Sequence, residues 1–99
     1  MNKLFVALVL TLPMLAQADD ALFRKSGCIG CHQAQTRVVG PSLKEVAAKY
    51  KDRKDAVEYL TGKIQNGGGG VWDAMAMPKQ SHVSEADAKL LAQYIMTVK

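Results

Sequence analysis

The chain has 99 residues, 48% of them hydrophobic, and a formal net charge of +4. This length allows one small domain, whose apolar core is marginal in size without a further stabilising element. The excess of 13 basic over 9 acidic residues is mild. Without a dense basic stripe or interleaved aromatic side chains it does not support nucleic-acid binding.

Residues 1–18 have the pattern of a secretory signal peptide. Lys3 provides the positive start, residues 4–12 are almost entirely apolar, and residues 16–18 (Ala-Gln-Ala) form a small-x-small cleavage site. The apolar run is shorter than the roughly 20 residues that span a bilayer, so we expect cleavage and not a membrane anchor. The mature chain, residues 19–99, is then expected to be a single domain in the periplasm, without a membrane span.

The remaining chain carries helix signals and no strand-like alternation, which predicts an all-α fold. The expected helices are residues 19–26, capped by Asp19 or Asp20 and ended near Gly27; residues 42–51, opened by the capping-box pair Ser42 and Glu45; residues 55–66, ended by Gly67; and residues 84–98, opened by Ser84 with Asp87. Each contains apolar residues at helical spacing, so these helices are expected to pack on a common core.

The stretch Cys28-Ile29-Gly30-Cys31-His32 places two thiols and an imidazole within five residues. C-x-x-C-H is the attachment signature of a c-type haem. The two sulfurs add to the porphyrin vinyl groups, and the adjacent histidine binds the iron. We therefore expect one covalently bound haem c, which would also enlarge the small core.

A redox dithiol and a zinc site are the alternatives for the same residues. A dithiol of this type requires a βαβ setting, which the helical prediction does not offer. Structural zinc usually takes four ligands, and His82 is the one further cysteine or histidine in the chain. His82 lies two residues before Ser84 in a predicted loop, where a surface position is favoured over a ligand role. The motif therefore favours haem over both alternatives.

The second axial position has four candidates in the mature chain, namely Met75, Met77, Met96 and His82. Met96 falls at the edge of the last helix, away from its apolar stripe. Met75 and Met77 both lie in the loop before that helix. Pro78 restricts the residue before it to extended geometry, which favours Met77 as the ligand. Met75 remains the open alternative.

The run of four glycines at residues 67–70 interrupts the chain between the third and fourth helices. It lacks the Gly-Lys-Ser/Thr ending of a phosphate-binding loop, so we interpret it as a flexible connector. If it left the methionine loop too loose to bind iron, an open haem would suit an enzyme or a ligand sensor. With the methionine bound, both axial positions are closed and electron transfer is the expected function.

The mature chain resembles the short bacterial class I cytochromes c, which are mono-haem periplasmic electron carriers. The residues that carry the resemblance are Gly27-Cys28-Ile29-Gly30-Cys31-His32, Val39-Gly40-Pro41, Val46-Ala47-Ala48-Lys49-Tyr50, Gly62-Lys63-Ile64, Gly70-Val71-Trp72 and Met77-Pro78. The resemblance implies the cytochrome c fold, about four short helices wrapped around one haem. Its first and last helices would cross where Phe23 meets Leu91 and Tyr94. It also implies that Met77, before the proline, is the second axial ligand.

The same resemblance implies roles for residues around the iron ligands. The carbonyl group of Pro41 would accept a hydrogen bond from the ring of His32 and fix its orientation. Trp72 and Lys63 would donate to a haem propionate. Gln80 occupies the place of an amide that can bond the methionine sulfur.

The resemblance further implies an electron carrier and not an enzyme. Such a protein would shuttle between a membrane quinol-oxidising complex and a terminal oxidase, peroxidase or nitrite reductase, and we expect it to be a monomer. Arg24, Lys25 and Lys79 lie near the cysteine motif or the methionine loop in the sequence. They are therefore candidates for steering the protein onto acidic redox partners.

Overall fold

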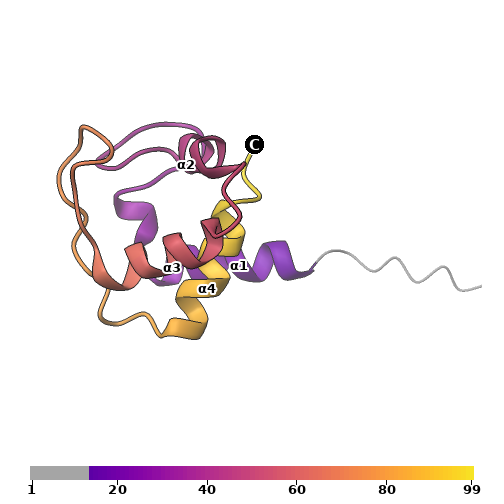
Figure 1. Ribbon diagram of the computed structural model, residues 1–99. Coiled ribbons are helices and arrows are strands. Elements are labelled where there is room, and N and C mark those ends of the chain that lie inside the picture. The colour runs from indigo at the N-terminus through magenta and orange to yellow at the C-terminus, as the bar shows by residue number, and fades with distance from the viewer. Residues whose placement is uncertain (1–13) are drawn as a thin grey trace, which may run out of the picture.

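A computed structural model describes residues 14–99, with side chains from residue 19 onward, so residues 1–13 of the predicted signal peptide lie outside the described residues. The elements are α1 (Met14–Lys25), the 3-10 turn η1 (Cys28–Gly30), α2 (Leu43–Tyr50), α3 (Ala56–Asn66) and α4 (Glu85–Ile95). Residues 14–99 contain no strand, which confirms the predicted all-α class (Figure 1). No helix in this range is both long and apolar enough to cross a membrane.

The three later helices begin at the predicted positions within one residue, and α2 and α3 also end there, whereas α4 ends at Ile95, three residues before its predicted end. Ser42 and Glu45 form the complete capping box at the start of α2, with the Ser42 hydroxyl accepting from the Glu45 amide at 3.1 Å. The Ser84 hydroxyl accepts from the Asp87 amide at 3.1 Å and opens α4. Gly67 ends α3, as predicted, and its N–H donates to the Lys63 carbonyl at 2.8 Å. These boundaries follow from local capping chemistry.

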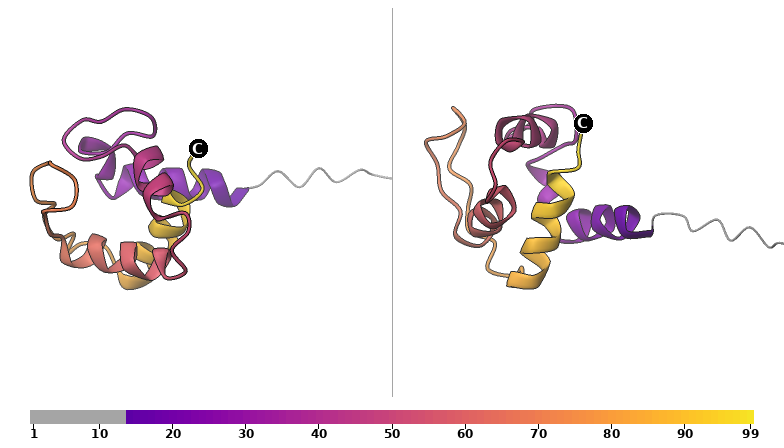
Figure 2. Two further views of the ribbon diagram at one scale, coloured as in Figure 1. Left: turned by 45° about the horizontal axis from the view of Figure 1, so that its top comes forward. Right: turned by 45° about the vertical axis from the view of Figure 1, so that its right-hand side comes forward.

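The first helix differs from its prediction. It begins at Met14 and passes through Asp19 and Asp20, so the predicted cap at either aspartate is wrong. Residues 15–18 read Leu-Ala-Gln-Ala, which are favourable in a helix, and nothing before Asp19 interrupts them. The end is as expected, because Gly27 adopts the left-handed conformation at φ 84°. In Figures 1 and 2 the N-terminal end of α1 protrudes on the side away from the loop that joins α3 to α4.

The core forms where α4 packs on α3 and crosses α1. The rings of Phe23 and Tyr94 lie 5.8 Å apart between centroids, and Leu91 is fully buried, which confirms the predicted crossing of the first and last helices. The Tyr94 hydroxyl also donates to Asp20 at 3.0 Å. The buried apolar residues of the core are Phe23, Leu43, Val46, Ala47, Tyr50, Ala56, Leu60, Ile64, Val83, Ala88, Leu91 and Ala92.

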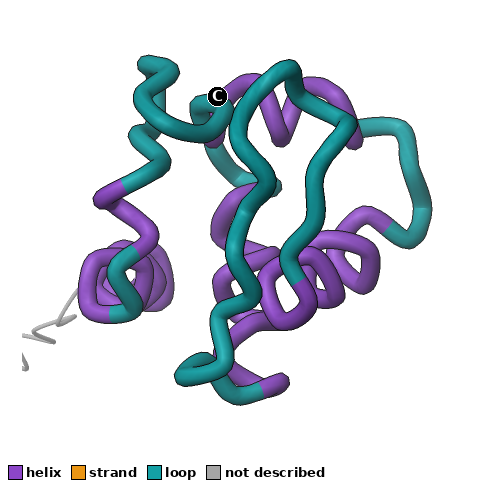
Figure 3. Tube along the Cα trace, turned by 90° about the vertical axis from the view of Figure 1, so that its left-hand side faces the viewer, coloured by secondary structure: helices purple, strands orange, loops and turns teal. Residues whose placement is uncertain are grey.

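Two long loops gather on one side of the helices. One runs from residue 31 to residue 42, and the other joins α3 to α4 over residues 67–84. Figure 3 looks onto this side of the molecule. The first loop follows the cysteine motif and the second contains the methionines, so the fold brings the two halves of the predicted site to the same side.

We predict that the two helix caps differ in their contribution to stability. Ser84 is exposed and makes one capping bond, so Ser84→Ala is expected to lower the free energy of unfolding by about 1 kcal/mol. Ser42 is 2% exposed, and its hydroxyl bonds both the Glu45 amide and the Glu45 carboxylate. Ser42→Ala removes both of these bonds at a buried helix cap and is expected to cost about 2 kcal/mol, at the upper end of the range for a lost cap. Urea unfolding of both variants measures the difference, and equal costs would contradict it.

A second prediction concerns Glu45 and acid pH. The backbone N–H of Ser42 lowers the pKa of the Glu45 carboxyl, with further contributions from the Ser42 hydroxyl and Arg37, against a smaller opposing effect of burial. Because the pKa is lower in the folded state, the ionised carboxylate stabilises the protein at pH values above the unfolded-state pKa of roughly 4.3. This stabilisation is lost as the pH falls through the folded-state pKa. Glu45→Gln is therefore expected to be less stable than wild type at pH 6, with the gap narrowing by pH 3. Urea unfolding at the two pH values tests this; a gap that does not narrow contradicts it.

Candidate functional site

A cavity of about 280 Å³ opens between the two loops and the helices behind them. Its walls are mostly apolar and include residues from α1, α2, α3 and α4. Every site residue predicted from the sequence lines this cavity: Cys28, Cys31, His32, Pro41, Lys63, Trp72, Met77 and Gln80. Met75 lines it as well, whereas Met96 and His82 are not among the lining residues. Of the four candidate second ligands, two therefore reach the cavity.

The cysteine motif forms a tight turn at one wall of the cavity. Gly27 reverses the chain, and the N–H groups of Cys31 and His32 both donate to the Cys28 carbonyl, at 3.1 and 2.9 Å. The two thiols are free and not joined in a disulfide. Burial raises the pKa of the Cys28 thiol, whereas a catalytic dithiol depends on a lowered pKa that stabilises the thiolate. The turn presents two thiols and an imidazole to one apolar space.

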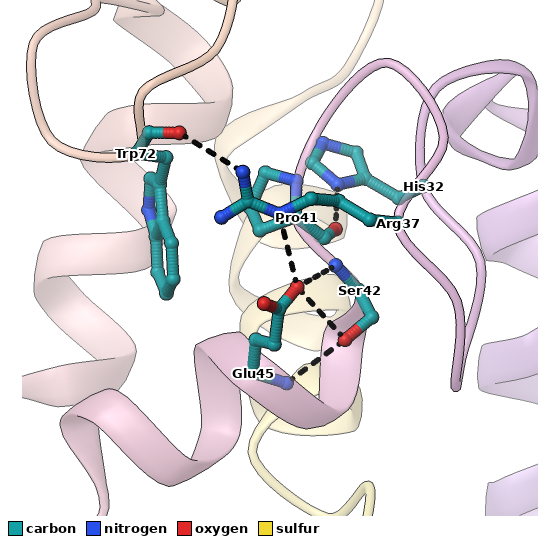
Figure 4. A network of polar contacts seen from close by, with 6 residues as sticks. All are labelled: His32, Arg37, Pro41, Ser42, Glu45 and Trp72. Atoms are coloured by element: carbon teal, nitrogen blue, oxygen red, sulfur yellow. Dashed lines mark hydrogen bonds and ion pairs between the residues drawn. The ribbon is translucent and has the colours of Figure 1, made fainter.

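The ring of His32 is held by two features of the following loop. His32 Nδ1 lies 2.8 Å from the Pro41 carbonyl oxygen (Figure 4). Because a carbonyl only accepts, Nδ1 carries the proton and Nε2 keeps a free lone pair. The ring also packs on the backbone of Gly40, where an added Cβ would lie 2.5 Å from His32 Cε1. Gly40 was not singled out for this role from the sequence, because its contact is with a side chain eight positions away.

Met77 is held by backbone pairing to the end of α3. The N–H of Met77 donates to the Gly68 carbonyl at 2.8 Å, and the Gly68 N–H donates to the Met77 carbonyl at 3.0 Å. Gly67 makes the close approach possible, because a Cβ there would lie 2.3 Å from the Met77 carbonyl oxygen. Its φ of 68° and ψ of −158° belong to a region that is essentially restricted to glycine. The interpretation of the glycines as a flexible connector is therefore wrong for Gly67 and Gly68.

Met75 and Met77 differ in their surroundings although both line the cavity. Met75 is 79% exposed. Met77 is half-buried and packs against the hydrophobic core. A soft ligand that is partly buried and fixed through its backbone is better placed to bind a metal than one that projects into water. The surroundings favour Met77.

Trp72 lies on the cavity wall, and Arg37 joins it to the loop of residues 31–42, which carries His32. Its ring stands edge-on to Tyr50, with centroids 6.3 Å apart. Arg37 Nη1 donates to the Trp72 carbonyl at 3.4 Å, and Arg37 Nε lies 3.5 Å from Glu45 Oε2 (Figure 4). Backbone pairing of Arg37 with His32 completes this connection. The sequence offered no local signal for Arg37, since its partners come from three separate segments.

Lys63 and Gln80 also face the cavity but are partly engaged elsewhere. Lys63 Nζ lies 5.5 Å from the centroid of the Tyr59 ring, a cation–π contact that leaves its N–H groups available. Gln80 Nε2 donates to the Pro78 carbonyl at 2.7 Å. One N–H of the Gln80 amide is thus used within its own loop, and the second N–H remains for another acceptor.

The side chains around the cavity fit a haem c. Two thiols suit thioether attachment, while the Nε2 of His32 and the sulfur of Met77 suit the two axial positions of an iron. The apolar walls suit the porphyrin faces. Within residues 14–99 no cluster of three or more histidine, cysteine, aspartate or glutamate side chains is placed to hold a bare metal ion. The absence of strands in this range removes the βαβ setting that the dithiol alternative requires.

The chain is similar to known proteins over nearly its whole length. The family model described as Cytochrome c matches residues 18–99. The chain is 53% identical over 95 residues to cytochrome c-552 of Nitrosomonas europaea, covering 96% of this chain and 92% of that protein. It is 44% identical over 99 residues to cytochrome c-552 of Hydrogenobacter thermophilus, covering all of both chains.

Solved structures give the same result. The crystal structure of wild-type Nitrosomonas europaea cytochrome c552 superposes with a TM-score of 0.79 at 54% identity, covering 81% of this chain and 99% of that one. The crystal structure of the class 1 cytochrome MtoD from Sideroxydans lithotrophicus gives a TM-score of 0.69 at 27% identity, covering 83% of this chain and 94% of that chain. The chain therefore belongs to the cytochrome c family, among the class I mono-haem bacterial cytochromes, which are electron carriers with one covalently bound haem c.

Proposed function

We propose that this cytochrome carries single electrons on a haem held by Cys28, Cys31, His32 and Met77. The cysteines form the thioethers, and His32 Nε2 and Met77 Sδ bind the iron. The observation that carries the proposal is that both ligand residues line one cavity and each is anchored by backbone contacts from its own loop. When bound, the haem supplies an iron that alternates between the ferric and ferrous states.

The anchoring supports electron transfer over ligand binding or catalysis. The Pro41 carbonyl holds His32 in one tautomer, and Gly40 leaves no space for the ring to tilt toward its backbone. The pairing with Gly68 restrains Met77 in the same way. Two ligands fixed in this manner move little between redox states, and they leave no open coordination position for a small molecule. An open-haem enzyme or sensor is disfavoured because Gly67 and Gly68, the glycines next to α3, are held by backbone hydrogen bonds.

Four further residues are proposed to support the haem. Pro41 orients the proximal ligand, as its hydrogen bond to His32 indicates. Trp72 and Lys63 are proposed to donate to a propionate, since both line the cavity and have N–H groups to offer. Gln80 is proposed to direct its second amide N–H toward the Met77 sulfur, with the first held by Pro78.

We further propose that residues 1–18 are a signal peptide and that residues 19–99 work in the periplasm. Cleavage after Ala18 would divide α1, which begins at Met14. Two contacts that attach α1 to α4, the hydrogen bond of Asp20 and the ring contact of Phe23 with Tyr94, lie after the cleavage site. The mature helix therefore keeps both of these contacts.

The proposed partners are a membrane quinol-oxidising complex as donor and a terminal oxidase, peroxidase or nitrite reductase as acceptor, met by a monomer. Lys25 and Lys79 are exposed and near the site in sequence, which supports steering by acidic partners. The Arg24 guanidinium is paired with Asp20 at 3.0 Å, so its contribution to steering is smaller.

The ligand assignment predicts opposite results for the two methionines. Ferric protein with Met77 bound is expected to show a sulfur-to-iron charge-transfer band at about 700 nm. Met77→Ala is expected to abolish this band and to let the reduced protein bind carbon monoxide, because the sulfur ligand is lost. Met75→Ala is the matched control and is expected to keep the band. Loss of the band in Met75→Ala alone would show that Met75 is the ligand.

The pairing at the end of α3 predicts a specific effect of Gly67→Ala. The new methyl group would displace the Met77 carbonyl, and the backbone conformation itself costs about 1–3 kcal/mol for a non-glycine residue. We expect weakening of the band at about 700 nm, caused by partial loss of methionine ligation.

Gly70→Ala is the control for that experiment. Gly70 also has a positive φ, of 87°, but nothing lies within 4 Å of its added Cβ. This variant is therefore expected to lose stability in urea unfolding while keeping the charge-transfer band. Equal loss of the band in both variants would mean that the effect comes from backbone strain and not from the contact with Met77.

A further inference from the structure

His82 forms a hydrogen bond between two segments that flank the cavity. Its Nε2 atom lies 2.8 Å from the backbone carbonyl oxygen of Ser26, 56 positions earlier in the chain. The carbonyl only accepts, so Nε2 carries a proton and donates. Ser26 directly follows α1, where carbonyl groups lack a helical partner, and the imidazole supplies one. The histidine is exposed, as predicted from the sequence, but it is not without a partner.

The bond joins the two chain segments that carry the proposed haem attachments. Ser26 lies two positions before Cys28, and His82 lies five positions after Met77. We call residues 77–83 the Met77 strap. Its other hydrogen bonds to the described chain run to α3 or the residues just after it: Met77 pairs with Gly68, and the Gln80 N–H donates to the Ile64 carbonyl at 3.0 Å.

The remaining hydrogen bonds of the Met77 strap are internal. Gln80 Nε2 donates to the Pro78 carbonyl, and the Val83 N–H donates to the Gln80 carbonyl at 3.1 Å. Without His82, hydrogen bonds would hold the strap on the α3 side alone. His82 supplies the hydrogen bond to Ser26 on the opposite side, next to the turn formed by residues 28–32, which we call the cysteine turn.

We propose that His82 is a positioning residue that latches the Met77 strap to the cysteine turn and thereby keeps the methionine side of the iron closed to external ligands. His82 does not line the cavity, so it acts through the strap and not as a ligand. The proposal rests on the proposed function in one respect, the assignment of Met77 as the axial ligand.

The test compares His82→Ala, His82→Leu and His82→Gln in the haem-loaded protein. Imidazole is added to the ferric form, where it must displace the methionine to bind. Loss of one hydrogen bond is expected to raise the imidazole affinity about two- to tenfold in the Ala and Leu variants. The Gln variant places an amide N–H where Nε2 stood and is expected to bind imidazole like the wild type. Wild-type imidazole affinity in the Gln variant would show that the hydrogen bond keeps the site closed, and not the volume or the charge of the imidazole ring.

Gln35→Ala is the matched control. Gln35 Nε2 donates to the Lys99 carbonyl at 2.9 Å, which is also an exposed side-chain to backbone bond between distant segments. Its removal is expected to leave the imidazole affinity unchanged. A comparable rise in Gln35→Ala, or no rise in His82→Ala and His82→Leu, would overturn the proposal.

Hydrogen exchange separates the latch from the ligand assignment. The Gln80 amide donates from the strap to the Ile64 carbonyl, and the Val83 amide donates to the Gln80 carbonyl within the strap. The exchange rates of these two amides therefore report opening of the strap, whichever methionine binds the iron. We expect about two- to tenfold faster exchange at both amides in His82→Ala and unchanged exchange in His82→Gln. Unchanged exchange in His82→Ala overturns the latch. A wrong assignment of Met77 is instead detected by retention of the charge-transfer band in Met77→Ala.

Discussion

The backbone pair between Gly68 and Met77 is the contact on which the methionine half of the site depends. It brings a residue from the long loop onto the end of α3, where its two hydrogen bonds of 2.8 and 3.0 Å restrain it. The pair forms because Gly67 turns the chain with φ 68° and has no side chain to strike the Met77 carbonyl. The position of the proposed ligand is therefore determined by how the preceding helix ends.

The histidine half of the site uses the same physical means. A glycine without a side chain, Gly40, lets the ring of His32 lie against the backbone, and the Pro41 carbonyl selects its tautomer. In both halves, backbone groups fix the ligand residue and no long flexible side chain takes part. If His32 and Met77 bind the iron as proposed, their positions are set before the iron changes charge, which would keep the structural change during electron transfer small. Arg37 connects the halves, because its guanidinium contacts Glu45 of α2 and the Trp72 carbonyl of the methionine loop.

Local chemistry explains which predictions succeeded. The starts of α2 and α4 and the end of α3 depend on residues within four positions of each boundary, so Ser42, Ser84 and Gly67 indicated them correctly. The start of α1 was wrong because an aspartate caps a helix only where the preceding residues leave it, and the segment before Asp19 is itself favourable in a helix. The interpretation of the glycines at 67 and 68 failed for a different reason. Glycine is compatible with a flexible segment and with close backbone packing. Here the packing partner is Met77, ten positions after Gly67, so the neighbouring residues could not indicate which of the two applies.

By itself, the sequence determined the helical class, the C-x-x-C-H motif and a preference for Met77 over Met75, because each depends on the chemistry of neighbouring residues. Only the tertiary structure decided which candidate ligands reach the cavity. It placed Met75 and Met77 there, left Met96 and His82 outside, and gave His82 a partner in Ser26. It also revealed Gly40 and Arg37 as supports of the site. Except for the contact of Gly40 with His32, which stays within one loop, these contacts join segments that are distant in the chain, and no local pattern of residues encodes a distance between such segments.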